Sequence, residues 1–110
     1  MRPPLEVRNP RTGLLDHAIV PPEPGELDAL ATAMRAAQES WHGRGLDARL
    51  EALRLWRDEL ARERDAIIDA LTVDTGRYGV SVLELDLVLS HLDRWCRLAP
   101  SLLADRGEQG

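Results

Sequence analysis

Few residues in this 110-residue chain have the type and spacing to do chemistry. Residues 43–48 read GRGLDA, which matches the G-x-G-x-x-A pattern of a dinucleotide-binding loop. Such a loop needs a strand before it and a helix after it, because the helix N-terminus supplies the amide donors for the phosphates. A helical pattern that ends at Trp41 and His42 precedes this motif. We therefore interpret residues 43–48 as a turn between two helices.

The single cysteine and the three histidines form no catalytic or metal-binding arrangement in the sequence. Cys96 falls on an apolar helical stripe, whereas a reactive thiolate needs an accessible, electropositive site. His91 lies five residues before it, about 140° round a helix. His17 and His42 belong to two further elements, and no third ligand stands at helical spacing from them. We predict no catalytic and no cofactor-binding residue in this chain.

The amino-acid composition excludes or disfavours several classes of function. The net charge is −5, which disfavours binding to nucleic acid or to an anionic membrane. All 14 basic residues are arginine, so chemistry through a lysine Schiff base is excluded. One cysteine excludes an intramolecular disulfide. No apolar run reaches the length of a signal peptide or a membrane span, so a cytoplasmic location is predicted.

The first 24 residues predict a β-hairpin arm. Six of the seven prolines lie here, and a helix does not tolerate that spacing. Residues 5–8 alternate apolar and polar side chains, as a half-buried strand does. Residues 9–13 (NPRTG) predict a turn in which Gly13 takes a positive φ, and residues 14–20 return as a second strand. Because a two-stranded hairpin is marginal in water, it must lie on something larger.

Residues 25–105 predict a three-helix segment, followed by a loose polar tail at 106–110. In the first helix, apolar side chains recur at intervals of three and four residues as far as Trp41. The second is predicted as one helix from Asp47 to about Val73, which contains no Pro or Gly. Its predicted buried side comprises Leu46, Leu50, Leu53, Trp56, Leu60, Ile67 and Leu71. Its predicted solvated face comprises Glu59, Glu63, Asp65 and Asp69. The fold class is therefore mainly α, an N-terminal β-hairpin followed by three helices.

Gly76 is predicted to close the second helix in the left-handed conformation, and Ser81 to open the third with Glu84 in capping-box spacing. Two features indicate a missing partner surface. The second helix would be about 40 Å long, whereas a compact domain of this size has a radius of gyration of about 13 Å. The third helix is apolar round most of its circumference, and such helices are normally covered on several sides.

Five motifs follow one another in order along the chain: residues 7–13 (VRNPRTG), 26–41, 49–60, 71–77 (LTVDTGR) and the helix from Glu84 to Pro100. They resemble, in turn, the V-x-N-P-x-T-G opening, the first helix ending in A-A-x-x-x-W, the R-x-x-x-L stretch, the L-x-x-E/D-T-G-K/R segment and the following helix of one family. Together they cover residues 6 to about 103. On these motifs the chain resembles the N-terminal segment of the aldehyde dehydrogenase superfamily.

The resemblance implies that the whole enzyme oxidises an aldehyde to a carboxylic acid through a thiohemiacetal and a thioester, with hydride transfer to NAD or NADP. In the family, the catalytic cysteine, the general-base glutamate, the oxyanion-hole asparagine and the dinucleotide site lie downstream of this segment. Residues 25–105 would then be part of the N-terminal, cofactor-side domain. We expect this segment to be a scaffold for the missing dehydrogenase core, inactive alone, in a homo-oligomeric parent enzyme.

The resemblance also implies one binding site in the segment itself. Some members hold a monovalent cation with backbone carbonyls just before Asn-Pro and with the acid of the D-T-G segment. The corresponding positions are Val7, Arg8 and Asp74. The alternative interpretation is that Asp74 caps backbone groups at the turn.

Two other classes of function stay open. The chain could be a stand-alone helical interaction module derived from the family, which would bind another protein surface through its exposed apolar faces. It could also be a free-standing cation-binding or sensory domain that uses Val7, Arg8 and Asp74.

Overall fold

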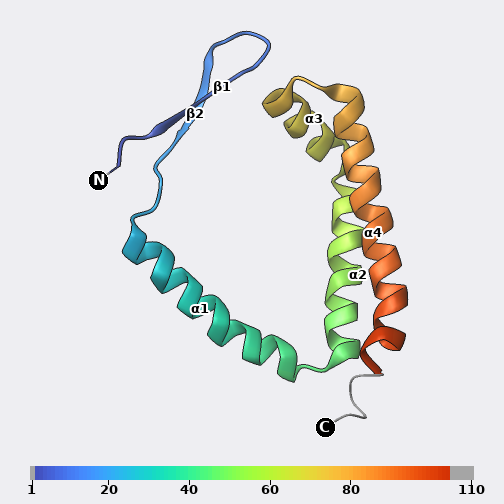
Figure 1. The fold of residues 1–110 in the computed structure, drawn as a ribbon. Helices are drawn as coiled ribbons and strands as arrows, with labels where there is room; N and C mark the ends of the chain where they lie inside the picture. Colours follow the sequence, from blue (N-terminus) through green and yellow to red (C-terminus); the bar gives the residue numbers. More distant parts are fainter. Residues whose placement is uncertain (1, 105–110) are drawn as a thin grey trace.

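The computed structural model, which describes residues 2–104, has the form of an open ring (Figure 1). The elements are β1 (Leu5–Arg8), β2 (Leu15–Ile19), α1 (Pro24–Gly43), α2 (Leu46–Arg62), α3 (Arg64–Thr75) and α4 (Tyr78–Ala104). The hairpin and α1 form one side of the ring, and α2, α3 and α4 form the other. The radius of gyration is 18.9 Å, well above the value of about 13 Å for a compact chain of this length.

The predicted β-hairpin is confirmed. β1 and β2 pair antiparallel, with an irregularity in the register between Val7 and Arg8. The side-chain Oδ1 of Asn9 accepts a hydrogen bond from the N–H of Arg11 at 2.9 Å, which folds the turn after β1. Gly13 has φ 74°, a conformation that glycine adopts without steric cost.

Helix α1 is set by local signals and buries none of its residues. Pro24 stands in its first turn, and the N–H of Glu23 donates to the Glu26 side chain at 2.7 Å in a capping box. Its predicted apolar stripe is present, but Leu30 is 57% and Met34 is 63% exposed. Within residues 2–104, the apolar stripe of this helix is therefore left uncovered.

The prediction of one long second helix is wrong, so within residues 2–104 four helices follow the hairpin. The helix is broken at Glu63, where φ is −89° and ψ is 13°. The break redirects the chain so that Leu50 of α2 and Ile68 of α3 are both buried, at 4% and 3% exposed. No Pro or Gly occurs at this position. The break lets both α2 and α3 pack on α4, and no local residue preference causes it. The fold class, a hairpin followed by helices, is confirmed.

The prediction that Ser81 caps the third helix is also wrong. Helix α4 begins at Tyr78, so Ser81 lies within its first turn and is 1% exposed. Its hydroxyl donates to the carbonyl of Arg77 at 2.8 Å. The physical reason is Gly76, which ends α3 as predicted at φ 71° and turns the chain tightly enough for α4 to start two residues later.

The buried residues come from α2, α3 and α4: Leu50, Ile68, Ser81, Leu85 and Cys96. Two ion pairs tie the same helices together, Arg57 with Asp93 and Arg64 with Asp86. Across residues 2–104, no helix combines the length and apolar character that crossing a membrane demands. The predicted tail at 106–110 lies outside the described residues.

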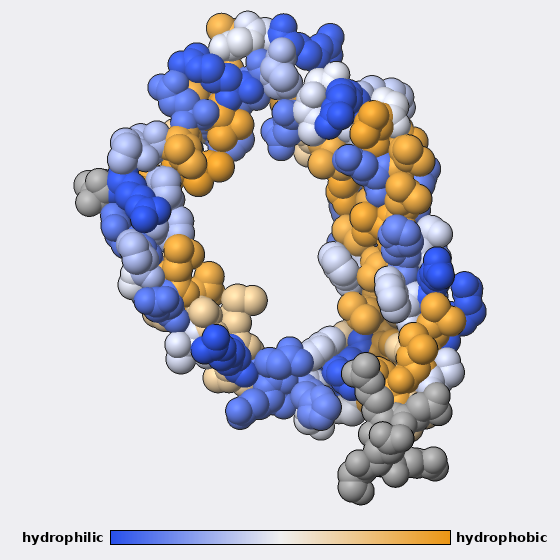
Figure 2. All heavy atoms as spheres, viewed as in Figure 1, coloured by the Kyte–Doolittle hydropathy of each residue, from blue (hydrophilic) through white to orange (hydrophobic). Residues whose placement is uncertain are grey.

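Apolar side chains gather on the sides of both walls that border the opening of the ring (Figure 2). The exposed apolar residues of α1 include Leu27, Leu30 and Met34, and those of α2 and α4 include Trp56, Leu87 and Val88. All six side chains are more than 40% exposed. The ring therefore presents an uncovered apolar surface of the kind that a folded chain normally buries.

Candidate functional site

The turn of the hairpin contacts the turn between α3 and α4, and this contact completes the ring around its central opening. A Cβ atom added to Gly76 would stand 3.3 Å from Cγ of Pro10 and 3.5 Å from Cγ of Arg11. Figure 1 shows the tip of the hairpin beside α3. The Asn-Pro motif and the Asp-Thr-Gly motif, which lie more than 60 residues apart in the sequence, are thus brought into contact.

The predicted cation site falls at this contact, and it stays a prediction. Val7 is half-buried in β1, and the Arg8 guanidinium donates to the carbonyl of Gly13 at 3.3 Å. Asp74 is exposed in the last turn of α3. The contact of Pro10 with Gly76 brings the segments that carry these three residues to one end of the molecule.

The alternative role of Asp74 as a cap can be compared with the hydrogen bonds of the turn. The N–H of Gly76 donates to the carbonyl of Thr72 at 2.8 Å. The N–H of Arg77 donates to Oγ1 of Thr75 at 3.3 Å. These two amide groups therefore take acceptors other than Asp74.

The other candidate residues do not converge. Cys96 is 7% exposed within α4, whereas His17, His42 and His91 lie in β2, α1 and α4. Over residues 2–104, no three His, Cys, Asp or Glu side chains are grouped so that they could hold a metal ion. Residues 43–48 join α1 to α2, with Gly45 at φ 82°, so the predicted helix–helix turn is confirmed.

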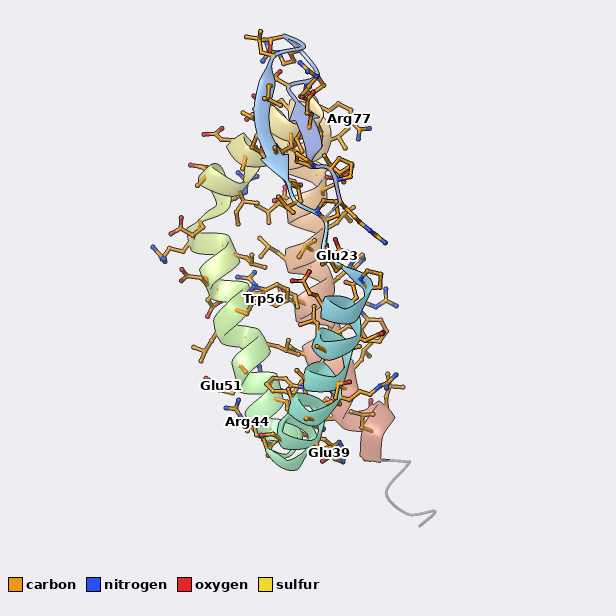
Figure 3. All side chains as sticks on the ribbon, turned by 90° about the vertical axis from the view of Figure 1, so that its left-hand side faces the viewer. Glu23, Glu39, Arg44, Glu51, Trp56 and Arg77 are labelled. Atoms are coloured by element: carbon orange, nitrogen blue, oxygen red, sulfur yellow. The ribbon has the colours of Figure 1, made fainter. Side chains whose placement is uncertain are left out.

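The site that sequence reasoning missed consists of two adjoining hollows, one between α2 and α3 and one between α2, α3 and α4, which share Trp56, Leu60 and Ile67. We call the two together the apolar groove. Its apolar lining comprises Trp56, Leu60, Ala66, Ile67, Ala70, Leu71, Leu85, Leu87 and Val88. Trp56, predicted on the buried side of its helix, is 51% exposed. Figure 3, which looks past α1 toward α2 and α4, shows Trp56 between these two helices. The signal in the sequence was present, but the hydrophobic pattern cannot tell a covered side chain from one that awaits a partner.

The charged side chains that line the apolar groove are all acidic. They are Glu59, Glu63 and Glu84. Glu59 accepts hydrogen bonds from the Arg62 guanidinium, which lowers the pKa of its carboxyl group. Arg62 also pairs with Glu63 at 2.8 Å. The groove is therefore apolar at its base with carboxylates along its border.

The opposite flank of α2 has a different character. A polar groove there is lined by Arg54, Arg57, Asp58, Asp93, Cys96 and Arg97. Nε and Nη2 of Arg57 donate to the two oxygens of Asp93 at 3.0 and 3.1 Å, and this hydrogen-bonded carboxylate raises the pKa of Arg57. Because Trp56 and Asp58 are two residues apart, their side chains lie about 160° apart round the helix. On one flank of α2 charged side chains thus form ion pairs, whereas the other flank is apolar.

Comparison with solved structures identifies the segment. The chain is similar to the protein named "Putative Aldehyde Dehydrogenase PutA" from Anabaena variabilis, with 42% sequence identity over 92% of this chain and a TM-score of 0.86. The chain matches an N-terminal segment of an aldehyde dehydrogenase. The resemblance predicted from the five motifs is confirmed. No protein-family model matches the chain, and none of the curated proteins matches it.

The match also bears on the open shape. The chain spans 22% of the length of PutA, so most of that dehydrogenase lies outside the matched segment. A TM-score of 0.86 means that the matched segment of PutA has nearly the same backbone arrangement as this chain. This arrangement therefore occurs inside a longer chain.

Proposed function

We propose that this chain is the N-terminal part of an NAD(P)-dependent aldehyde dehydrogenase and that its role there is structural. The observation that carries the proposal is the match to PutA at 42% identity over a fifth of that protein's length. The apolar sides of the ring support it, because they are the surface that a dehydrogenase core would cover. In this role the hairpin and the four helices buttress the cofactor-side domain.

The chemistry of the proposed whole enzyme would be carried by other residues. The G-x-G-x-x-A motif at 43–48 connects two helices, and this setting does not fit a dinucleotide. NAD or NADP is therefore expected on the rest of the enzyme, and no catalytic step is assigned to the residues described here. We expect the 110-residue chain alone to reduce neither cofactor with any aldehyde above a heat-killed control.

A segment exchange tests the structural role. In PutA, the matched segment would be replaced by this chain, and a second PutA variant would lack the segment altogether. We expect the deletion to be insoluble or inactive, and the exchanged protein to be soluble with NAD(P)-dependent aldehyde oxidation near that of intact PutA. If the exchanged protein behaves like the deletion, the proposed role is wrong.

The alternative function is a stand-alone helical interaction module, and the exposed apolar residues support it equally. The native mass of the protein from its source separates the two. A mass several times 12.3 kDa on a single chain supports the dehydrogenase, whereas a 12.3 kDa chain held in a complex supports the module. A cytoplasmic location and a homo-oligomeric parent enzyme are further parts of the first proposal.

We also propose the monovalent cation site at Val7, Arg8 and Asp74. The contact of Pro10 with Gly76 supports it, because it brings the two contributing turns together. A site filled at 100 times its dissociation constant adds about 2.7 kcal/mol of stability. The melting temperature should then differ between K⁺, Na⁺ and choline buffers, and Asp74→Asn should remove the difference. Equal melting temperatures in the three buffers would reject the site.

A further inference from the structure

We propose that the apolar groove binds an amphipathic helix that carries Arg or Lys beside its apolar ridge. The inference rests on the proposed function, since this helix would belong to the part of the dehydrogenase outside the present segment. The occupant has to fill the hollow between Trp56 of α2, Ile67 of α3 and Val88 of α4.

The walls of the groove favour a helix over a strand. All three walls are α-helices, whose backbone groups are already bonded within each helix. A strand laid in the groove would find no N–H or C=O partner and would leave its own backbone groups unsatisfied against apolar side chains. A helix satisfies its own backbone, and its side-chain ridge packs between those of its neighbours.

The charges on the groove select a basic helix. The charged residues that line it are Glu59, Glu63 and Glu84. Arg62 pairs with the first two, so one guanidinium stands against three carboxylates. Glu84 is exposed in α4. An occupant with Arg or Lys beside its ridge would complement this border, and one with Asp or Glu would be repelled.

The same charges argue against α1 of this chain, or of a second copy, as the occupant. α1 has an apolar ridge of suitable spacing, and it faces the opening. However, it carries Glu26, Asp28 and Glu39 against Arg35. A helix with this excess of acidic residues is disfavoured beside the carboxylates of the groove.

Two synthetic helical peptides test the specificity on the 110-residue chain. Both have leucine at i, i+3, i+4 and i+7 over 18 residues, and the flanking positions are Lys in one and Glu in the other. In fluorescence anisotropy at low salt, the Lys peptide should bind about tenfold or more tightly than the Glu peptide. Equal binding of the two peptides would overturn the proposal.

Variants with matched controls test whether the peptide binds in the groove. Leu87→Ser with Val88→Ser should weaken binding of the Lys peptide about tenfold or more, because two apolar contacts are lost. Leu102→Ser, at an exposed leucine outside the groove, should leave it unchanged. Glu59→Gln with Glu84→Gln should weaken binding of the Lys peptide severalfold at low salt, whereas Glu51→Gln on α2 should not. If the control variants weaken binding as much, the groove is not the site.

The segment exchange in PutA separates the two proposals. If the exchanged PutA is active and stays so with Leu87→Ser and Val88→Ser, the groove inference fails and the structural role stands. If the exchanged PutA fails although the free chain prefers the Lys peptide, the structural role fails, and the groove binds a basic helix that does not belong to a dehydrogenase.

Discussion

The two sides of the ring use their apolar residues differently. On one side, α2, α3 and α4 contribute all the residues that are buried within residues 2–104. On the other side, α1 has no buried residue, and every residue of β2 is exposed. Both sides have amphipathic patterns of similar quality in the sequence. The difference shows that the hydrophobic pattern specifies which face is to be covered, while the covering surface can lie outside the segment.

The same contrast separates what is stabilised within the segment from what depends on other contacts. Most helical stability in proteins comes from packing of the apolar face rather than from helix propensity. α1 has its capping box and several alanines, but none of its residues is buried. α4 is packed against both α2 and α3. Substitutions on the two sides should therefore have very different costs.

The largest effect is expected in the packed side. Leu85→Ala removes a side chain that is 4% exposed, and should lower the free energy of unfolding by about 2–5 kcal/mol. Leu30→Ala, at a residue of α1 that is 57% exposed, should change it by less than about 0.5 kcal/mol. Urea denaturation followed by circular dichroism measures both. A similar cost for the two variants would show that α1 is packed in solution.

The next effect is expected where the two sides touch. Gly76→Ala places a Cβ on a residue with φ 71° and 3.3 Å from Pro10, and should cost about 1–2 kcal/mol. It should also raise hydrogen exchange in β1 and β2, because the hairpin loses its contact with α3. Gly79→Ala is the control, since its Cβ meets nothing within 4 Å in a helix. That substitution should stabilise the chain by about 0.5–1 kcal/mol, and a loss of stability from it would contradict the helical start at Tyr78.

The contrast also explains which parts of the fold could be predicted. The hairpin, with its Asn-Pro turn and Gly13, and the end of α3 at Gly76 depend on local conformational preferences that single residues reveal. The break at Glu63 and the burial of Ser81 depend on how α3 and α4 pack, and no local residue type marks them. Trp56 shows the same limit for the groove, because a tryptophan on an apolar stripe has the same pattern whether its partner lies inside or outside the segment.

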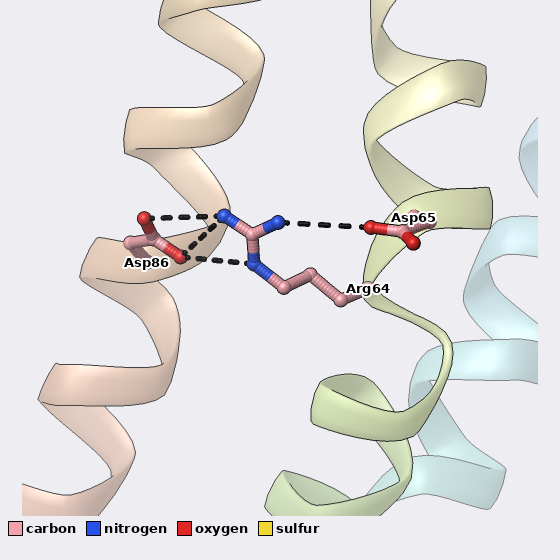
Figure 4. A network of polar contacts seen from close by, with 3 residues as sticks. All are labelled: Arg64, Asp65 and Asp86. Atoms are coloured by element: carbon pink, nitrogen blue, oxygen red, sulfur yellow. Dashed lines mark hydrogen bonds and ion pairs between the residues drawn. The ribbon is translucent and has the colours of Figure 1, made fainter.

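A smaller effect is expected for the ion pair that joins the start of α3 to α4. Nη2 of Arg64 lies 3.3 Å from Oδ1 of Asp86 on α4, and Nη1 lies 3.7 Å from Asp65 (Figure 4). Because the side chains of Arg64 and Asp86 are 39% and 53% exposed, solvent screens the interaction. Asp86→Asn should cost about 0.2–1 kcal/mol, and less at 1 M salt. A cost that salt leaves unchanged would mean that Asp86 acts by packing.

The smallest effect concerns the pH dependence of the acidic border of the groove. Hydrogen bonds from Arg62 lower the pKa of Glu59 below its ordinary value of 4.5. A lowered pKa in the folded state means that the stabilisation is present above pH 4.5 and is lost as the pH falls through the lower value. Asp93 raises the pKa of Arg57, so Arg57 stays charged through this range and gives no slope between pH 6 and 9.

Glu59→Gln should therefore lose less stability than the unsubstituted chain between pH 5 and pH 3. Between pH 6 and 9 its stability should depend on pH as that of the unsubstituted chain does. Thermal unfolding at several pH values measures both ranges. Arg62→Gln is the matched variant, because it removes the donor and should flatten the same part of the profile. If the free energy of unfolding of Glu59→Gln falls as steeply below pH 5 as that of the unsubstituted chain, Glu59 is not held by Arg62 in solution. Its carboxylate would then be free to meet a basic residue on the helix that we propose for the apolar groove.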